Sequence, residues 1–153
     1  MQLKSSSEKD TVEFAKEKAS EIFKEIKEGK RTSIFLYLSG DVGAGKTTFS
    51  RAFIEKWYEL QNIPLKETIT SPTFSLVNTY NTPLALAHFD LYRIDSLEEL
   101  SQLDFESYFY ETPVCIVEWL EKIPDYESLL PENSIQIKFI IKSETTREIS
   151  FNK

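Results

Sequence analysis

The residues from Gly40 to Thr47 combine the side chains and the spacing that hold nucleotide phosphates in many proteins. They read GDVGAGKT and satisfy the pattern Gly-x-x-x-x-Gly-Lys-[Ser/Thr] at every fixed position. Glycine tolerates positive φ angles and brings backbone N–H groups close to phosphate oxygens. Three of the protein's 4 glycines lie in this stretch. The sequence therefore predicts a phosphate-binding loop with contacts from Asp41, Val42, Gly43, Ala44 and Gly45.

The three residues after the last loop glycine carry the amine and the hydroxyl groups of the predicted site. Lys46 is expected to reach the β- and γ-phosphates, Thr47 to place its hydroxyl on Mg²⁺, and Thr48 to donate to the α-phosphate. The positive end of the following helix adds its dipole. The alternative is a chance match in a strand-to-helix turn. However, an apolar strand precedes the loop and an amphipathic helix follows it, as phosphate binding requires.

Two acidic residues end apolar stretches that are expected to be strands. Glu118 follows Val114–Val117, and Asp90 follows Leu84–Phe89. Hydrolysis needs an acid that steadies Mg²⁺ and a group that orients the attacking water. We predict Glu118 as the main Mg²⁺ partner and Asp90 as an acid near the metal or the water, with Lys46 completing the catalytic set. The simpler alternative for each acid is a strand cap at the rim of the sheet.

A hydroxyl-rich turn, Thr70–Thr73, lies between the predicted loop helix and the next strand. In P-loop switches a threonine from such a segment covers the γ-phosphate and Mg²⁺, which makes Thr73 a candidate nucleotide contact. An ordinary turn organised by Pro72 explains the same residues equally well. The single histidine, His88, is left out of the catalytic set, because a lone histidine is more often a core or rim residue than a ligand.

Apolar periodicity predicts alternating helices and strands. A helix is expected from Asp10, which forms a capping pair with Glu13, to Gly29. Further helices are expected at 46–60 and 96–103, and strands at 33–38, 73–80, 84–90, 114–118, 135–141 and 148–151. No element is predicted before Asp10. The fold class is α/β, a three-layer P-loop NTPase-like fold with a mixed central sheet that has a parallel centre and antiparallel additions.

Length and composition indicate one domain over residues 1–153, with an ordinary globular core. The chain has 18 basic and 25 acidic residues, and this net charge of −7 disfavours direct, tight binding to nucleic acid. The one cysteine, Cys115, is expected to be a buried thiol. No apolar stretch approaches the ~18 residues that cross a bilayer, and the first ten residues are too polar for a secretory signal. We therefore expect no membrane partner and a cytoplasmic protein.

Five stretches resemble the successive signatures of the TsaE (YjeE) family, in order and at suitable spacing. They are 38–53 (LSGDVGAGKTTFSRAF), 71–80 (SPTFSLVNTY), 88–94 (HFDLYRI), 97–100 (LEEL) and 117–119 (VEW). The resemblance implies a small ATPase that uses ATP and Mg²⁺. It also implies that this ATPase acts together with the paired proteins TsaB and TsaD. These proteins install threonylcarbamoyl on the adenosine next to the anticodon of tRNAs. Contact with tRNA would be indirect, because TsaD performs the transfer.

The matching motifs also imply roles for individual residues. Lys46 and Thr47 correspond to phosphate and metal residues, Glu118 to a Mg²⁺ residue, and Asp90 to a site acid needed for activity. Trp119 matches the tryptophan of VEW, where it fits either core packing or a lid over the site. The switch-like interpretation of Thr73 and the role of Thr47 both gain support from the resemblance.

Two positions depart from the family pattern. Val42 replaces a leucine that is common in the loop, which is conservative because only the backbone there meets phosphate. Thr146 precedes Arg147 where the family often has glycine, so no nucleotide role is assigned to Arg147.

Two other functions stay open, a small P-loop metabolite kinase and a nucleotide-dependent switch with little hydrolysis. A kinase would need an arginine-rich lid and a phosphate-acceptor pocket, and the chain offers neither clearly. A GTPase would carry an Asn-Lys-x-Asp element, which is missing. The acidic balance and the lack of an obvious substrate pocket favour an ATPase that is slow alone and stimulated by partner proteins.

Overall fold

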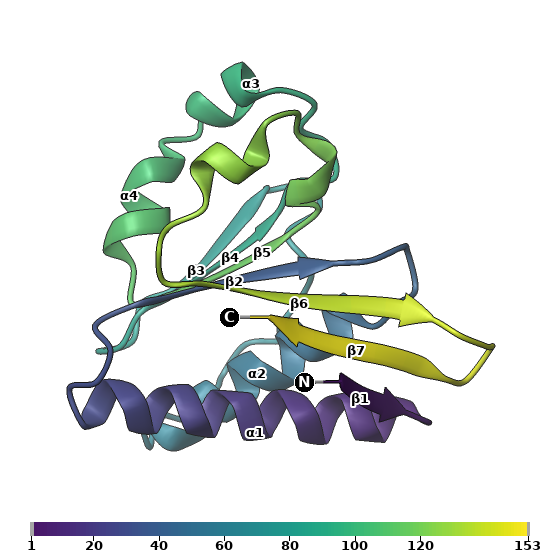
Figure 1. Ribbon diagram of the computed structural model, residues 1–153. Coiled ribbons are helices and arrows are strands. Elements are labelled where there is room, and N and C mark those ends of the chain that lie inside the picture. The colour runs from purple at the N-terminus through teal and green to yellow at the C-terminus, as the bar shows by residue number, and fades with distance from the viewer. Residues whose placement is uncertain (1, 153) are drawn as a thin grey trace.

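The computed structural model describes residues 2–152 and places helices on both faces of one sheet (Figure 1). Helices α1 (Glu8–Lys27) and α2 (Lys46–Leu60) cover one face, and α3 (Leu97–Ser101) and α4 (Phe105–Glu111) cover the other. The strands are β1 (Gln2–Ser5), β2 (Ile34–Ser39), β3 (Val77–Tyr80), β4 (Leu86–Asp90), β5 (Val114–Glu118), β6 (Ser134–Ile141) and β7 (Arg147–Asn152). Two short 3₁₀ turns, η1 (Leu120–Lys122) and η2 (Tyr126–Leu129), follow β5.

Within residues 2–152, seven strands form one sheet in the order β1-β7-β6-β2-β5-β4-β3. The central strands β6, β2, β5 and β4 run parallel, whereas β1, β7 and β3 pair antiparallel at the edges. The predicted mixed sheet is therefore confirmed. Parallel pairing aligns the carboxyl ends of neighbouring strands, so Asp90 of β4 lies opposite Glu118 of β5, which in turn pairs with Leu38 of β2.

Successive side chains along each central strand point alternately to the two faces of the sheet. Strands β2, β4 and β5 are buried along their whole length, as expected of parallel strands covered on both sides. Ile116 packs in the cluster beneath α1 and α2, whereas its neighbour Cys115 packs against α3 and α4. By the same alternation, His88, Asp90 and Glu118 point toward α2.

Cys115 is fully buried in the middle of β5, which confirms the predicted buried thiol. Burial raises the pKa of this thiol, because the apolar surroundings disfavour the charged thiolate. The residue is therefore a packing residue and not a nucleophile.

The N-terminal segment differs from the prediction. Strand β1 pairs with β7 at the edge of the sheet, where periodicity predicts no element. Helix α1 begins at Glu8 and not at Asp10, because the Ser7 hydroxyl caps the helix by accepting a hydrogen bond from the Asp10 amide. The Asp10 carboxylate instead accepts from the Ser6 amide at 2.8 Å. Gly29 lies just past the helix with a φ of +70°, which confirms the predicted end.

The predicted hairpin forms, but its first strand begins at Val77 and not at Thr73. Residues 73–76 instead continue the turn that contains Pro72. The Leu76 amide donates to the Pro72 carbonyl at 2.7 Å, and Leu76 adopts a left-handed φ of 69°. This turn brings the Thr73 side chain back toward β4.

Helix α4 is not predicted by the sequence patterns. Its first turn follows Asp104, which has a φ of 51° and, among the described residues, donates or accepts no side-chain cap hydrogen bond. The helix is nevertheless held in place because Phe105 and Phe109 are buried against the sheet. Tertiary packing therefore decides its structure without a local start signal.

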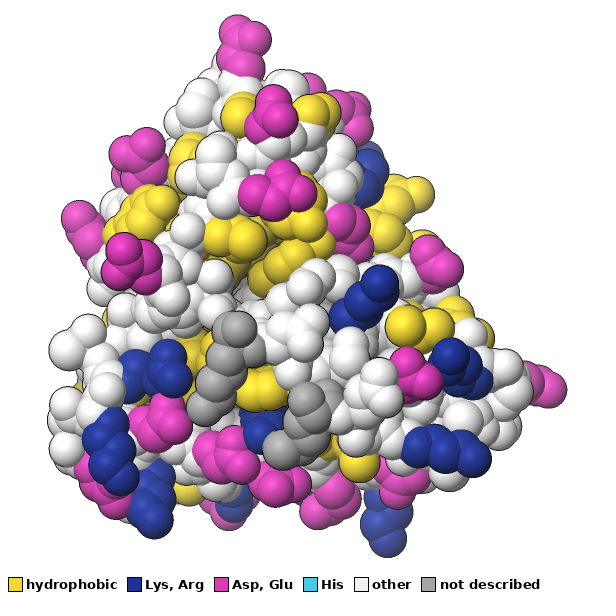
Figure 2. Space-filling model, viewed as in Figure 1, with side chains coloured by type: hydrophobic (Ala, Val, Ile, Leu, Met, Phe, Trp, Pro, Cys, Tyr) yellow, Lys and Arg dark blue, Asp and Glu magenta, His cyan; other side chains and the backbone are white. Residues whose placement is uncertain are grey.

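Charged residues are distributed unevenly between the layers. The segment from residue 94 to residue 137 holds 11 acidic residues and a single basic one, Lys122. Figure 2 shows acidic side chains over the α3–α4 layer, while Lys and Arg gather mostly around α1 and the β6–β7 hairpin. The net negative charge of the protein therefore arises mainly from this segment, which includes α3 and α4. Among the described helices, none is long and apolar enough to cross a membrane.

Candidate functional site

The predicted phosphate loop connects the end of β2 to the first turn of α2. Gly40 has a φ of +141°, and a Cβ at this position would lie 2.5 Å from the Phe139 carbonyl oxygen, so only glycine fits against β6. Gly45 leads into α2 in a left-handed conformation, and among the described residues no side chain caps this helix. The first amides of α2 are therefore left for another partner, as at helix N-termini that bind anions.

Lys46 folds back over the loop, and only 5% of its surface is exposed. Its Nζ donates to the Gly40 carbonyl and lies 3.4 Å from the centre of the Trp119 ring. Burial lowers the pKa of Lys46, and the nearby carboxylates, led by Glu121 and Glu118, oppose this shift. The ammonium has three N–H donors, so donation to the Gly40 carbonyl leaves two for other partners, and Lys46 lines the cavity in front of the loop.

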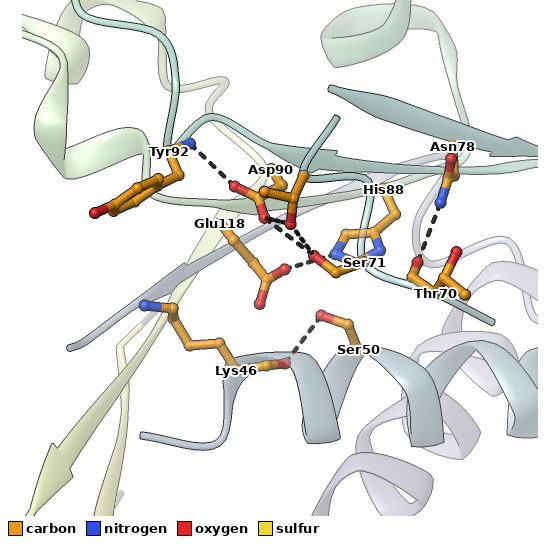
Figure 3. Close-up of polar contacts among 10 residues, drawn as sticks. Lys46, Ser50, Thr70, Ser71, Asn78, His88, Asp90, Tyr92 and Glu118 are labelled. Atoms are coloured by element: carbon orange, nitrogen blue, oxygen red, sulfur yellow. Dashed lines mark hydrogen bonds and ion pairs between the residues drawn. The ribbon is translucent and has the colours of Figure 1, made fainter. Parts of the chain in front are cut away.

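A cavity of about 430 Å³ opens in front of the loop. The structure brings together in its wall the predicted residues of the loop, the turn and β4. These residues are Asp41, Val42, Gly43, Ala44, Gly45, Lys46, Thr47, Thr48, Thr73 and Asp90, joined by Ser71, Tyr92 and Trp119. Glu118 is the one predicted site residue outside this lining. It is 1% exposed and lies at the end of β5, between the sheet and Lys46 of α2 (Figure 3).

Asp90 is held by three hydrogen bonds at the end of β4 (Figure 3). Its Oδ2 accepts from the hydroxyls of Ser71 and Thr73, at 3.0 and 3.1 Å. Its Oδ1 accepts from the Tyr92 amide at 3.0 Å. The turn that contains Thr73 is thereby attached to the carboxylate, and Asp90 is oriented toward the cavity by the same contacts.

Glu118 shares a hydrogen bond with a histidine that the sequence analysis leaves out of the site. The Nε2 atom of His88 lies 2.8 Å from Oε2 of Glu118, and His88 is also 1% exposed. The sequence does hold one signal for this contact. His88 lies two residues before Asp90, so alternation along β4 places both on the same face of the sheet.

Two aromatic rings form the rim of the cavity. Trp119 has a left-handed φ of 68°, and this backbone conformation follows directly after Glu118. Its ring lies over the Lys46 amine and contacts the Tyr92 ring, with the centroids 5.0 Å apart. Trp119 therefore covers the amine in this structure. Arg93 lies outside the cavity lining, 5.1 Å over the exposed ring of Phe74.

Glu121 is a further residue at the loop that the sequence analysis does not identify. Its Oε1 accepts from the Gly40 amide and its Oε2 from the Tyr37 hydroxyl, both at 3.3 Å. Through these contacts η1 braces the first residue of the phosphate loop.

A second cavity, of about 400 Å³, lies on the other side of the loop. Its walls are the start of α1, the β6–β7 turn, and loop residues 43–45 with Thr48. Arg147 at the start of β7 donates from Nη2 to the Gly43 carbonyl at 3.0 Å. Arg147 and the residues before Asp10, to which the sequence assigns no role, therefore meet at the loop.

The described residues contain no group of three or more His, Cys, Asp or Glu side chains that could hold a metal ion. Mg²⁺, however, is usually held by one or two carboxylates or hydroxyls together with substrate phosphates, and not by an all-protein cage. Thr47 is exposed in the first cavity, and Oε1 of Glu118 is buried without a hydrogen-bond partner among the described residues. These two oxygen ligands fit Mg²⁺ that arrives with a nucleotide.

Comparison with known proteins identifies relatives over most of the chain. The model of the family described as "Threonylcarbamoyl adenosine biosynthesis protein TsaE" matches residues 5–149. The protein named tRNA threonylcarbamoyladenosine biosynthesis protein TsaE from Rickettsia typhi is 36% identical over 148 residues, which are 96% of this chain and 91% of that protein. The protein of the same name from Haemophilus influenzae is 40% identical over 106 residues, 69% of this chain and 61% of that protein.

A solved structure shares the fold. YdiB of Bacillus subtilis matches with a TM-score of 0.69 and 28% identity, over 99% of this chain and 83% of that one. The family match, the relatives and this structure agree with the resemblance found in the motifs. The chain belongs to the TsaE family.

Proposed function

We propose that this protein is a Mg²⁺-dependent ATPase that supports the formation of threonylcarbamoyladenosine in tRNA by acting on the TsaB–TsaD complex. The observation that carries the proposal is the convergence of Lys46, Thr47 and Asp90 in one cavity at the uncapped start of α2. The names of the relatives, all tRNA threonylcarbamoyladenosine biosynthesis proteins, support the pathway.

In this proposal the loop residues divide the work on the triphosphate. The loop amides and Lys46 hold the phosphates, while Thr47 and Glu118 hold Mg²⁺. When bound, Mg²⁺ neutralises charge on the phosphate oxygens. Asp90 orients a water for attack on the γ-phosphorus; the new P–O bond replaces the bond to the β-phosphate oxygen, so ADP and inorganic phosphate leave.

The second cavity is proposed to take the nucleoside half of ATP. It shares Gly43, Ala44, Gly45 and Thr48 with the first cavity, so one ligand threaded past the loop would occupy both. Ser6, Ser7 and Thr11 at its wall supply polar groups near the start of α1, although the Thr11 hydroxyl is hydrogen-bonded to Ser5 and the Ser7 hydroxyl accepts from the Asp10 amide.

Two contacts in this structure support the proposal that the isolated protein turns over slowly. Lys46 is bound to the Gly40 carbonyl, and Asp90 is bound to the Ser71 and Thr73 hydroxyls. These contacts already occupy part of the hydrogen-bonding capacity of both groups, and the proposal is that this slows their action on a nucleotide. Docking of the TsaB–TsaD pair is proposed to release these contacts.

The test is the ATP turnover rate with and without the TsaB–TsaD pair, with Lys46→Ala as the inactive control. We expect inorganic phosphate to be released slowly by the protein alone and faster with the pair. A phosphorylated metabolite would instead indicate a kinase, and nucleotide binding without any phosphate release would indicate a switch. If calorimetry on folded protein detects no heat from ATP with Mg²⁺, the proposal fails.

A further inference from the structure

The Glu118 carboxylate occupies an unusual environment for a charged group. It is 1% exposed, and within residues 2–152 its one hydrogen-bond partner is His88, while Oε1 has none. A buried carboxylate with an unsatisfied oxygen is costly unless a further partner completes it. Its place beside the Lys46 amine, at the end of β5, makes a ligand of the phosphate site the natural partner for Oε1.

His88 is placed to control the orientation of the Glu118 carboxylate, and with it the direction in which Oε1 points. It lies on β4, across from Ile116 and two residues before Asp90, which pairs with Glu118. A carboxylate that binds a metal is ionised and only accepts hydrogen bonds, so in that role of Glu118 the proton between Nε2 and Oε2 belongs to the imidazole. The 2.8 Å contact fixes one oxygen and leaves the other free (Figure 3).

His88 is also separated from the nucleotide. It does not line either cavity at the loop and is 1% exposed. The other ring nitrogen, Nδ1, has no hydrogen-bond partner among the described residues. A histidine kept only for packing would not need to leave a buried polar atom unsatisfied, since an apolar residue would fill the space without that cost.

We infer that His88 is a positioning residue, which holds the Glu118 carboxylate so that Oε1 faces the metal that accompanies the nucleotide. The inference rests on the proposed function, because it takes Glu118 as a Mg²⁺ residue. Residues that orient a metal ligand through its second oxygen or nitrogen typically contribute about 10- to 100-fold in metal affinity.

A matched pair of amide substitutions isolates the hydrogen bond. The side chain of His88→Gln carries an N–H donor to about the place of Nε2, whereas the shorter His88→Asn places its amide near Nδ1, out of reach of Glu118. We expect the Mg²⁺ concentration needed for tight binding of a fluorescent ADP analogue to rise about 10- to 100-fold in His88→Asn and by no more than about threefold in His88→Gln. Binding of the analogue in EDTA should be unchanged in both variants.

The outcomes separate this inference from the proposed function. If wild-type protein and His88→Asn respond equally to Mg²⁺ while Glu118→Ala is impaired, His88 does not position Glu118. Equal impairment of both His88 variants would also overturn the role assigned to the hydrogen bond. If the wild type binds no nucleotide with Mg²⁺, the proposed function fails first.

Because His88 is the one histidine of the chain, a measurement on the unsubstituted protein is also available. In protein labelled with ¹⁵N-histidine, two-bond correlation spectra should show a single imidazole with its proton on Nε2. Glu118→Ala should shift that nitrogen strongly. A wild-type imidazole that exchanges between tautomers, as exposed histidines do, would contradict the inference even if every His88 variant failed to fold.

Discussion

The two cavities beside the phosphate loop share a wall but differ in how they are built. The first joins the ends of β4 and β5 to the loop, and its acids and hydroxyls are held by one another, as Asp90 is by Ser71 and Thr73. The second joins the start of α1 to the β6–β7 turn, where Arg147 donates to the backbone carbonyl of loop residue Gly43. In the proposed function the first cavity serves the chemistry on phosphate and the second serves binding.

The largest effect expected from this division is at Lys46. Lys46→Ala should lower ATP turnover by about 10³-fold, because the amine is the positive side chain placed to stabilise the γ-phosphate in the transition state. Lys56→Ala on the same helix, whose amine pairs with Glu59, is the charge-matched control. Phosphate release measured for both variants checks the prediction. Equal rates in Lys46→Ala and Lys56→Ala would contradict the assignment of the chemistry to the first cavity.

Glu118→Ala should lower turnover by about 10²-fold while nucleotide binding in the presence of Mg²⁺ remains measurable. Turnover should fall because the variant lacks the carboxylate proposed to hold Mg²⁺, and binding should remain because Glu118 does not line the cavity that takes the phosphates. Single-turnover kinetics alongside calorimetry separate the two quantities. Unchanged turnover would remove Glu118 from the mechanism.

A substitution at Gly40, where the loop that forms the shared wall begins, should destabilise the protein. Gly40→Ala places a Cβ 2.5 Å from the Phe139 carbonyl oxygen and should cost about 3 kcal/mol in the free energy of unfolding. Gly43→Ala is the matched control, since its Cβ would meet no atom within 4 Å and its cost is limited to the positive φ, about 1 kcal/mol. Urea unfolding of both variants measures the difference, and equal costs would contradict the close fit of the loop against β6.

The smallest effect is expected in the second cavity. Arg147→Ala should weaken nucleotide affinity by about three- to tenfold, because it removes the hydrogen bond that braces Gly43. The Mg²⁺ dependence should stay that of the wild type, and Lys142→Ala, from the same hairpin, should leave the affinity unchanged. Titration with a fluorescent ADP analogue checks both. If Arg147→Ala lost turnover but kept its affinity, the second cavity would serve chemistry and not binding, contrary to the division proposed here.

The contrast between the cavities also explains which parts of the site can be predicted from the sequence. The first cavity depends on local patterns, a loop motif and two strands that end in acids, and parallel pairing brings Asp90 and Glu118 together in register. The second depends on Arg147 meeting Gly43, 104 positions away, and no periodicity encodes that contact. The helix at 46–60 and the strand at 114–118 are correct to the residue, because a glycine-rich start and an apolar run mark them.

The remaining differences have similar causes. Strand β1 is too short to show alternation, and its place is decided by pairing with β7. His88 is excluded by a general rule about lone histidines, whereas its role depends on a neighbour 30 positions away. Mg²⁺ binding, the TsaB–TsaD partners and the cytoplasmic location stay predictions.

The burial of Cys115 has a practical consequence for studying this protein. Cys115 is the sole thiol of the sequence, it lies in the strand that ends at Glu118, and it is buried. Modification by a thiol reagent under native conditions therefore requires β5 to open, so the labelling rate reports the free energy of that opening. Comparing the rate with and without nucleotide would measure how strongly ligand binding stabilises the centre of the sheet.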